Sequence, residues 1–220
     1  MDKVALRSLI RARRRAAASP VAAQSGDSSA AVSANTAGAN LTKNTLEWLG
    51  TLSESHPGMV VCAYISTGYE PSTQELLRAC TAAGYSVYVP VCEPDFRLSW
   101  VLWHPDVELL RSTLAPVMEP QGPRIPFADL ASVVGATSDD GQVRAIIVPA
   151  LAVDTDGIRL GQGGGYYDRF LAGVSGVPLA AIIYDDECLP AGTLPHDSLD
   201  MPVNYALTPS AWIRLGTGFG

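Results

Sequence analysis

Short apolar runs of strand length recur along the 220-residue chain, separated by segments with helical spacing. A continuous apolar run of this length is typical of a strand that is buried on both faces. The clear runs are residues 59–65, 85–91, 143–149 and 178–184, with weaker candidates at 98–103 and 203–207. Such strands alternating with helices predict a three-layer α/β/α fold with a mostly parallel central sheet, in a single domain over residues 1–220.

Helices are expected between these strands. The apolar spacing predicts them at residues 42–52, 72–83 and 165–171. In the second of these helices, Ser72 and Glu75 have the spacing of a capping box, in which each side chain bonds the other's backbone N–H. Gly84 follows as a residue suited to end that helix.

The first 40 residues are compositionally unusual. Residues 1–18 are rich in Arg and Ala, which fits either a removable transit peptide or an N-terminal helix of the mature protein. The helix would place four apolar side chains roughly on one face, namely Val4, Ala5, Leu9 and Ala12. Residues 16–40 are mostly Ala, Ser and Gly and bury too little apolar surface to offset the entropy of ordering. We therefore expect a frayed helix end or a flexible segment at about 19–40.

Charge and cysteine content exclude several classes of function. The formal charge is −7, and the basic residues are concentrated in the first 20 positions, so the rest of the chain is acidic. An acidic body argues against broad binding to a nucleic-acid backbone. No apolar run reaches the roughly 18 residues that a membrane helix needs. The four cysteines are widely spaced without a CxxC pair, which argues against a zinc site and fits a reducing cytoplasm.

A glycine-rich loop is the strongest functional signal. In a parallel sheet, ligands bind at the carboxyl ends of the strands, here the loops after Ile65, Val91 and Pro149. The third of these loops leads to four glycines within five residues: Gly161, Gly163, Gly164 and Gly165. Glycines before a helix let backbone N–H groups converge on an anion, and Arg159 and Arg169 flank them. The loop matches neither the P-loop nor the GxGxxG pattern, and a plain surface turn is the alternative interpretation.

A family resemblance rests on this loop. Residues 160–169, Leu-Gly-Gln-Gly-Gly-Gly-Tyr-Tyr-Asp-Arg, preceded by Val148-Pro149 and Asp154, resemble the signature of the 5-formyltetrahydrofolate cyclo-ligases. Weaker elements of that pattern occur in the right order at Lys3 and Arg7, 70–73, Pro90, 119–120, 200–203 and Thr208. The resemblance covers nearly the whole chain outside residues 16–40. The departures are small: Val153 stands where an aromatic residue is frequent, and Asn204 where Asp is common.

The resemblance implies a ligase that converts 5-formyltetrahydrofolate and ATP to 5,10-methenyltetrahydrofolate, ADP and phosphate, with Mg²⁺. The ATP-binding positions that it implies are Lys3, Arg7, Arg159, Gly161, Gly163, Gly164, Gly165, Tyr166 and Tyr167, of which Lys3, Arg7 and Arg159 would act in catalysis. The implied folate contacts are Ile65, Glu70, Gln162 and Tyr166. The implied metal ligands are Asp168 and Asp200.

Plainer interpretations stay open beside these. Lys3 and Arg7 could be solvated helix charges, Glu70 and Asp200 loop residues, and Asp168 an ion-pair partner of Arg169 or a helix N-terminal charge. The chain could also be a relative that binds a nucleotide or folate without turnover, or an isomerase or acyl-CoA transferase on a similar scaffold. We expect a cytoplasmic monomer whose partners are ATP and a reduced folate, with no nucleic acid and no membrane.

Overall fold

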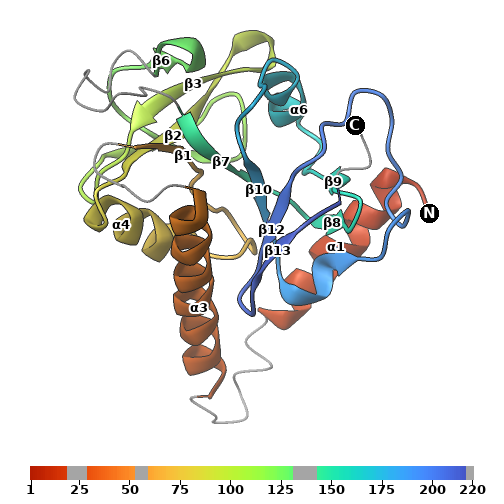
Figure 1. Cartoon of the computed structure of the whole chain (residues 1–220). Helices are drawn as coiled ribbons and strands as arrows, with labels where there is room; N and C mark the ends of the chain where they lie inside the picture. Colours follow the sequence, from red (N-terminus) through yellow and green to blue (C-terminus); the bar gives the residue numbers. More distant parts are fainter. Residues whose placement is uncertain (19–28, 53–58, 131–142, 217–220) are drawn as a thin grey trace.

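The computed structural model in Figure 1 describes residues 1–18, 29–52, 59–130 and 143–216. At its centre lies a sheet in the order β13-β12-β10-β7-β1-β2-β3-β6. In that order the strands are Trp212–Arg214, Tyr205–Leu207, Leu179–Ile182, Val143–Pro149, Val60–Cys62, Ser86–Glu93, Arg97–Leu102 and Ile125–Pro126. Neighbours from β12 to β2 run parallel, while β13, β3 and β6 pair antiparallel at the two edges. The predicted mostly parallel central sheet is confirmed.

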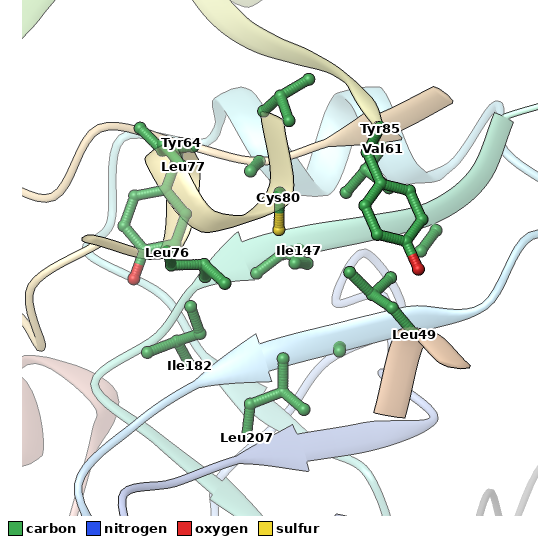
Figure 2. Packing of buried hydrophobic residues seen from close by; sticks show 14 of the residues in the cluster. Leu49, Val61, Tyr64, Leu76, Leu77, Cys80, Tyr85, Ile147, Ile182 and Leu207 are labelled. Atoms are coloured by element: carbon green, nitrogen blue, oxygen red, sulfur yellow. The ribbon is translucent and has the colours of Figure 1, made fainter. Parts of the chain in front are cut away.

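Helices cover both faces of this sheet because its strands are apolar on both faces. On one face, α3 (Ser29–Leu52) and α4 (Gln74–Ala82) pack against side chains such as Val61, Ile147 and Ile182 (Figure 2). On the other face, α6 (Tyr166–Leu171) packs against a second cluster that contains their neighbours Val60 and Ile146. Alternate residues of each strand thus face opposite layers, as the pleat requires.

A smaller sheet carries the N-terminal helix α1 (Lys3–Ala17). The sheet has the order β11-β8-β9, with strands Cys188–Leu189, Ala152–Asp154 and Arg159–Leu160. Ile10 of α1 is buried against Leu151 and Leu160 beside it. A separate hairpin pairs β4 (Leu109–Arg111) with β5 (Met118–Pro120), and single 3₁₀ turns lie at Pro94–Phe96, Phe127–Asp129 and Asp185–Glu187. These short elements were not expected from the sequence.

The start of α3 differs from the start that the sequence predicted, while the flexible segment expected at about 19–40 stays a prediction. Residues 19–28 lie outside the described residues, but 29–40 form the first half of α3, which begins at Ser29 rather than near Thr42. Alanine has the highest helix propensity of any residue, and this alanine-rich stretch continues directly into a helix whose second half is anchored by packing. The sequence analysis therefore placed the start of this helix too late.

Two local predictions about helices were also wrong. In α1 the buried side chains are Ile10 and Arg14, whereas Val4 is 69% exposed and Leu9 38% exposed, so the helix buries a different face from the expected one. In α4 the N-cap is Thr73, with no side-chain capping bond, so the Ser72–Glu75 capping box does not form. The Thr73 hydroxyl instead donates to the carbonyl of Tyr64 at 2.7 Å and ties α4 to the end of β1.

Within the described residues, no helix is long and apolar enough to cross a membrane.

Candidate active site

A cavity of about 730 Å³ opens at the carboxyl ends of β1, β2 and β7. Its wall includes Ile65, Cys92 and Pro149, which lie at or just beyond the ends of these three strands. The loops that the sequence singled out therefore meet at one cavity, because neighbouring parallel strands end at the same edge of the sheet. The glycine loop and α1 complete the wall, and the volume is typical of a small-molecule site.

The glycine loop, residues 161–165, joins β9 to α6. The hairpin before it turns at Asp154, whose buried carboxylate accepts a backbone hydrogen bond at 3.0 Å, and at Gly157, which has a φ of +89°. Both residues therefore shape the turn between β8 and β9. Gly163 and Gly165 have φ values of +96° and +76°, which L side chains rarely adopt. The path of the loop along the cavity therefore depends on glycine at these two positions.

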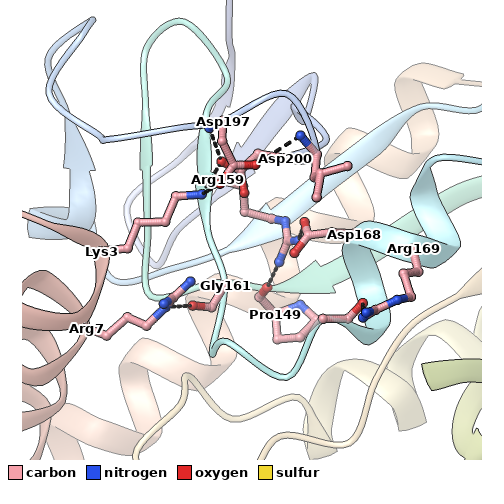
Figure 3. Close-up of polar contacts among 11 residues, drawn as sticks. Lys3, Arg7, Pro149, Arg159, Gly161, Asp168, Arg169, Asp197 and Asp200 are labelled. Atoms are coloured by element: carbon pink, nitrogen blue, oxygen red, sulfur yellow. Dashed lines mark hydrogen bonds and ion pairs between the residues drawn. The ribbon is translucent and has the colours of Figure 1, made fainter. Parts of the chain in front are cut away.

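Two cations of α1 reach the site from one side of the helix (Figure 3). The ammonium group of Lys3 donates to Asp200 and, at 2.7 Å, to Asp197. Partial burial disfavours the charged form of Lys3, but these two hydrogen bonds outweigh it and raise its pKa. One turn further on, the Nε–H of Arg7 donates to the carbonyl of Gly161 at 2.9 Å. Neither residue is a freely solvated helix charge.

Arg159 and Asp168 form an ion pair at the inner side of the glycine loop. The Arg159 side chain is only 2% exposed and donates to the carbonyl of Pro149 at 3.1 Å. Its guanidinium carbon lies over the ring of Tyr167, 6.0 Å from the ring centroid. Burial, reinforced by nearby acidic charge, raises the pKa of Tyr167 well above its ordinary value, so this phenol stays neutral. Arg169, the sequence candidate for pairing with Asp168, donates to a backbone carbonyl of the loop instead.

The four positions that the resemblance assigned to folate line the same cavity. The side-chain amide of Gln162 donates to the carboxylate of Glu70 at 2.9 Å, which joins the glycine loop to the loop after β1. The ring of Tyr166 packs against that of Phe96 with 5.5 Å between centroids. Ile65 adds an aliphatic contact at the end of the first strand. The cavity thus combines a carboxylate, an amide and aromatic faces.

Comparison with known proteins adds to this geometry. The model of the 5-formyltetrahydrofolate cyclo-ligase family matches residues 1–209. The chain belongs to this family. A curated 5-formyltetrahydrofolate cyclo-ligase of Mycolicibacterium smegmatis is 33% identical over 172 residues, covering 76% of this chain and 80% of the relative. The Escherichia coli protein of the same name is 32% identical over 152 residues, covering 68% of this chain and 78% of the relative.

A solved structure supports the fold of this cyclo-ligase family member. The 5,10-methenyltetrahydrofolate synthetase of Mycoplasma pneumoniae superimposes with a TM-score of 0.62, covering 95% of this chain and 99% of that one. At 16% identity this likeness concerns the fold alone. Family membership makes the chain a ligase, and it overturns the alternative of an isomerase or acyl-CoA transferase on a similar scaffold.

Three basic residues of α1 that the sequence analysis did not name line the cavity of this cyclo-ligase, namely Arg11, Arg14 and Arg15, whereas Lys3 and Arg7 do not line it. Arg11 donates to Gln162, and Arg14 forms a buried ion pair with Glu187. A signal was available for Arg11, since Lys3, Arg7 and Arg11 recur every four residues and so lie along one side of a helix. Nothing in the sequence pairs Arg14 with a residue 173 positions away.

The two proposed metal ligands are both hard oxygen donors, but each is held by a cation. Asp168 lines the cavity and uses Oδ1 for Arg159, while Asp200 uses Oδ2 for Lys3 and does not line the cavity. Across the described part of the chain, no group of three or more His, Cys, Asp or Glu side chains could hold a metal ion by itself. Magnesium bound with a nucleotide needs only one or two carboxylates plus phosphate oxygens, and Asp168 fits that requirement.

We assign no role in the reaction to the cysteines or the histidines. All four cysteines are free thiols. Burial and the neighbouring carboxylate of Glu119 raise the pKa of Cys92 to about 12, so the cavity wall contains a protonated thiol there. His104 and His196 are exposed loop residues, as expected, and His56 lies outside the described residues.

Proposed function

We propose that the chain cyclises 5-formyltetrahydrofolate to 5,10-methenyltetrahydrofolate with ATP, releasing ADP and phosphate. One observation carries the proposal beyond family membership: the glycine loop, three arginines of α1 and the Glu70–Gln162 pair all border one cavity, and Arg7 contacts the loop from behind that wall through the carbonyl of Gly161. That arrangement offers a place for a polyphosphate next to a place for a polar heteroaromatic ring. Proximity of the two substrates is the main requirement of a phosphoryl transfer to a weakly nucleophilic oxygen.

The chemistry follows from the poor leaving ability of a formamide oxygen. That oxygen attacks the γ-phosphorus of ATP, the bond to the β-phosphate oxygen breaks, and ADP leaves. The N10 atom of the folate then attacks the formyl carbon, which is now activated as an imidate phosphate. The carbon–oxygen bond breaks, phosphate leaves with the electron pair, and N10 loses its proton. The protein positions the reactants and neutralises the charge that develops on phosphate oxygens.

The glycine loop and the α1 cations are the proposed phosphate-binding group. Backbone N–H groups at Gly161, Gly163, Gly164 and Gly165, with Tyr166 and Tyr167 after them, can approach phosphate closely because no Cβ intervenes at the glycines. Lys3 and Arg7 approach from α1 and supply positive charge. Arg159 is almost fully buried and engaged with Asp168, so we propose that it acts mainly by holding that carboxylate.

Magnesium, when bound with ATP, would neutralise phosphate charge and polarise the γ-phosphate. Asp168 is the carboxylate we propose for it, because it lies at the cavity wall beside the glycine loop. Asp200 is the second proposed magnesium ligand, and it lies beside Lys3, from which it accepts a hydrogen bond. The four free thiols fit a reducing cytoplasm as the place of action, and we propose that the chain acts there as a monomer.

A direct assay decides between this function and a non-catalytic binding relative. The methenyl product has its own absorbance, so it is followed from 5-formyltetrahydrofolate with ATP and Mg²⁺, and again with each component omitted. Product that needs both ATP and Mg²⁺, with one ADP released per methenyl group, supports the ligase. Binding of ATP and folate without product would make the chain a binding protein instead.

A further inference from the structure

Three polar side chains from three separate elements form a chain of hydrogen bonds along the cavity wall. The guanidinium of Arg11 on α1 donates to the side-chain oxygen of Gln162, with Nη2 at 2.9 Å and Nε at 3.1 Å. The amide nitrogen of Gln162 donates in turn to Glu70 Oε1 at 2.9 Å. Glu70 Oε2 accepts from the backbone N–H of Thr67 at 2.8 Å. All three side chains line the cavity.

The charges at the two ends fix the direction of this chain. A guanidinium can only donate hydrogen bonds, and a carboxylate can only accept them. An amide between the two satisfies both partners in one orientation alone, with its oxygen toward Arg11 and its nitrogen toward Glu70. The opposite orientation would set two donors against each other at one end and two acceptors at the other.

We propose that Arg11 is a positioning residue for folate binding, because it fixes the amide of Gln162 and thereby holds Glu70 in one place. The proposal rests on the proposed function, in which Glu70 and Gln162 contact the folate. A carboxylate has about four acceptor positions, so Glu70 keeps capacity for a ligand N–H after its three protein bonds, from Gln162 and from the backbone and hydroxyl of Thr67. The affinity of Glu70 for a ligand N–H depends on a fixed position of its carboxylate, and Arg11 fixes that position through Gln162.

The role of Arg11 is separable from that of the phosphate-binding cations. Arg7 holds the glycine loop at the carbonyl of Gly161, one residue before Gln162. Arg11 adds a bond to the carbonyl of Gln162 at 2.6 Å, but the loop keeps its attachment to α1 through Arg7 when Arg11 is replaced. Loss of Arg11 should therefore weaken folate binding while leaving ATP binding nearly unchanged.

The test compares Arg11→Gln with Arg13→Gln. Arg13 is an exposed residue of the same helix that does not line the cavity, so it controls for loss of one positive charge. We expect Arg11→Gln to raise the KM for 5-formyltetrahydrofolate about tenfold, the scale of one lost hydrogen bond to a charged group. The KM for ATP and kcat should stay within about threefold of the parent, and Arg13→Gln should match the parent throughout.

A second variant separates positioning from a merely structural contact. Gln162→Glu keeps the size of the side chain and strengthens its bond to Arg11, but it sets a second carboxylate against Glu70. Gln162 is itself a proposed folate contact, so Arg11→Gln is measured both in the parent and in the Gln162→Glu background. If Arg11 only fastened α1 to the loop, Arg11→Gln would raise the KM for folate by the same factor in both. Positioning through Gln162 predicts little further increase in the Gln162→Glu background, because the second carboxylate has already displaced Glu70 there.

A spectroscopic measurement tests the hydrogen-bond chain from Arg11 through Gln162 to Glu70 without any turnover. In the free protein the side-chain amide protons of Gln162 should be shifted by their bond to Glu70, and Arg11→Gln should change that shift while Arg13→Gln should not. An unchanged chemical shift of the Gln162 amide protons in Arg11→Gln would overturn the positioning role of Arg11. Equal effects of Arg11→Gln and Arg13→Gln on the KM for folate would overturn it too. Absence of methenyl product from the parent protein overturns the proposed function instead and leaves the spectroscopic result standing.

Discussion

Arg14 of α1 and Glu187 of the turn after β10 form a bidentate ion pair inside the protein. Nε lies 2.7 Å from Oε1 and Nη2 lies 2.6 Å from Oε2, and the two side chains are 4% and 7% exposed. Nη2 also donates to the carbonyl of Ala150, just beyond β7, at 2.8 Å. One guanidinium therefore joins α1, the carboxyl end of a central strand and the turn after β10. Because α1 carries Lys3 and Arg7, this pair determines where those cations lie.

Removing one partner of this pair should be strongly destabilising. Arg14→Met leaves the Glu187 carboxylate buried without its cation, and we expect a loss of about 3–5 kcal/mol in the free energy of unfolding. Adding Glu187→Gln to Arg14→Met should restore part of it, because the unpaired charge is then gone. Urea unfolding measures both, with Arg13→Met on the exposed side of α1 as the control. Equal stability of Arg14→Met and Arg13→Met would show that the pair contributes nothing.

The free thiols should react slowly in the folded protein. Burial raises the pKa of Cys80 to about 12, and burial with Glu119 does the same for Cys92. Only the thiolate is nucleophilic, so at pH 8 a rise from the ordinary value of 9.0 cuts the reactive fraction about a thousandfold. A disulfide reagent at pH 8 should therefore label all four cysteines quickly in urea but neither of these two in the native state. Raising the pH toward 11 should accelerate native labelling, and fast labelling of Cys92 at pH 8 would contradict its protonated state.

The sequence predicted the strands that lie within apolar runs of about seven residues. The runs at 59–65 and 143–149 correctly predicted β7 and the three-residue β1, and their shared sheet edge predicted the place of the cavity. The strands β9 and β11 have two residues each and lie in no such run, so the sheet that carries α1 was not predicted. The tertiary environment, not local propensity, makes these residues strands.

The glycine loop was found because its composition is unusual, whereas its partners were found only in part. The expected buried face of α1 was Val4, Ala5, Leu9 and Ala12, but the helix buries Ile10 and Arg14 instead. From sequence alone, an Arg is expected at the surface unless a carboxylate that pairs with it can be identified. The partner of Arg14 is Glu187, which lies far away along the chain. Likewise, Asp168 looked available to a metal, and only the fold brings Arg159 against it.

Asp168 and Asp200 should respond differently when each loses its charge. Asp168→Asn keeps the shape but makes a poorer ligand, so we expect half-maximal activity to need about tenfold more Mg²⁺. Asp200→Asn removes a partner of Lys3, and its main expected effect is a rise of a few-fold in the KM for ATP as Lys3 loses its fixed place. Titrating Mg²⁺ at saturating ATP, and ATP at saturating Mg²⁺, separates the two. An unchanged Mg²⁺ requirement in Asp168→Asn would exclude it as a ligand.

Gly163 is a position where the glycine loop should not tolerate a side chain. Its φ of +96° disfavours any L residue, and a Cβ there would lie 3.4 Å from the guanidinium carbon of Arg7. Gly163→Val should therefore lower ATP affinity by a factor of at least 100, since it disturbs both the loop and the cation beside it, and excess Mg²⁺ should not restore it.

Gly176→Val is the matched control, because that glycine also has a positive φ, +72°, but a Cβ there would meet nothing within 4 Å. It should cost stability of about 1–2 kcal/mol without a change in ATP affinity. Calorimetric titration with ATP and urea unfolding of both variants separate backbone strain from loss of the site. If Gly163→Val binds ATP as tightly as Gly176→Val, the glycine loop is only a turn, and the phosphates bind elsewhere in the cavity.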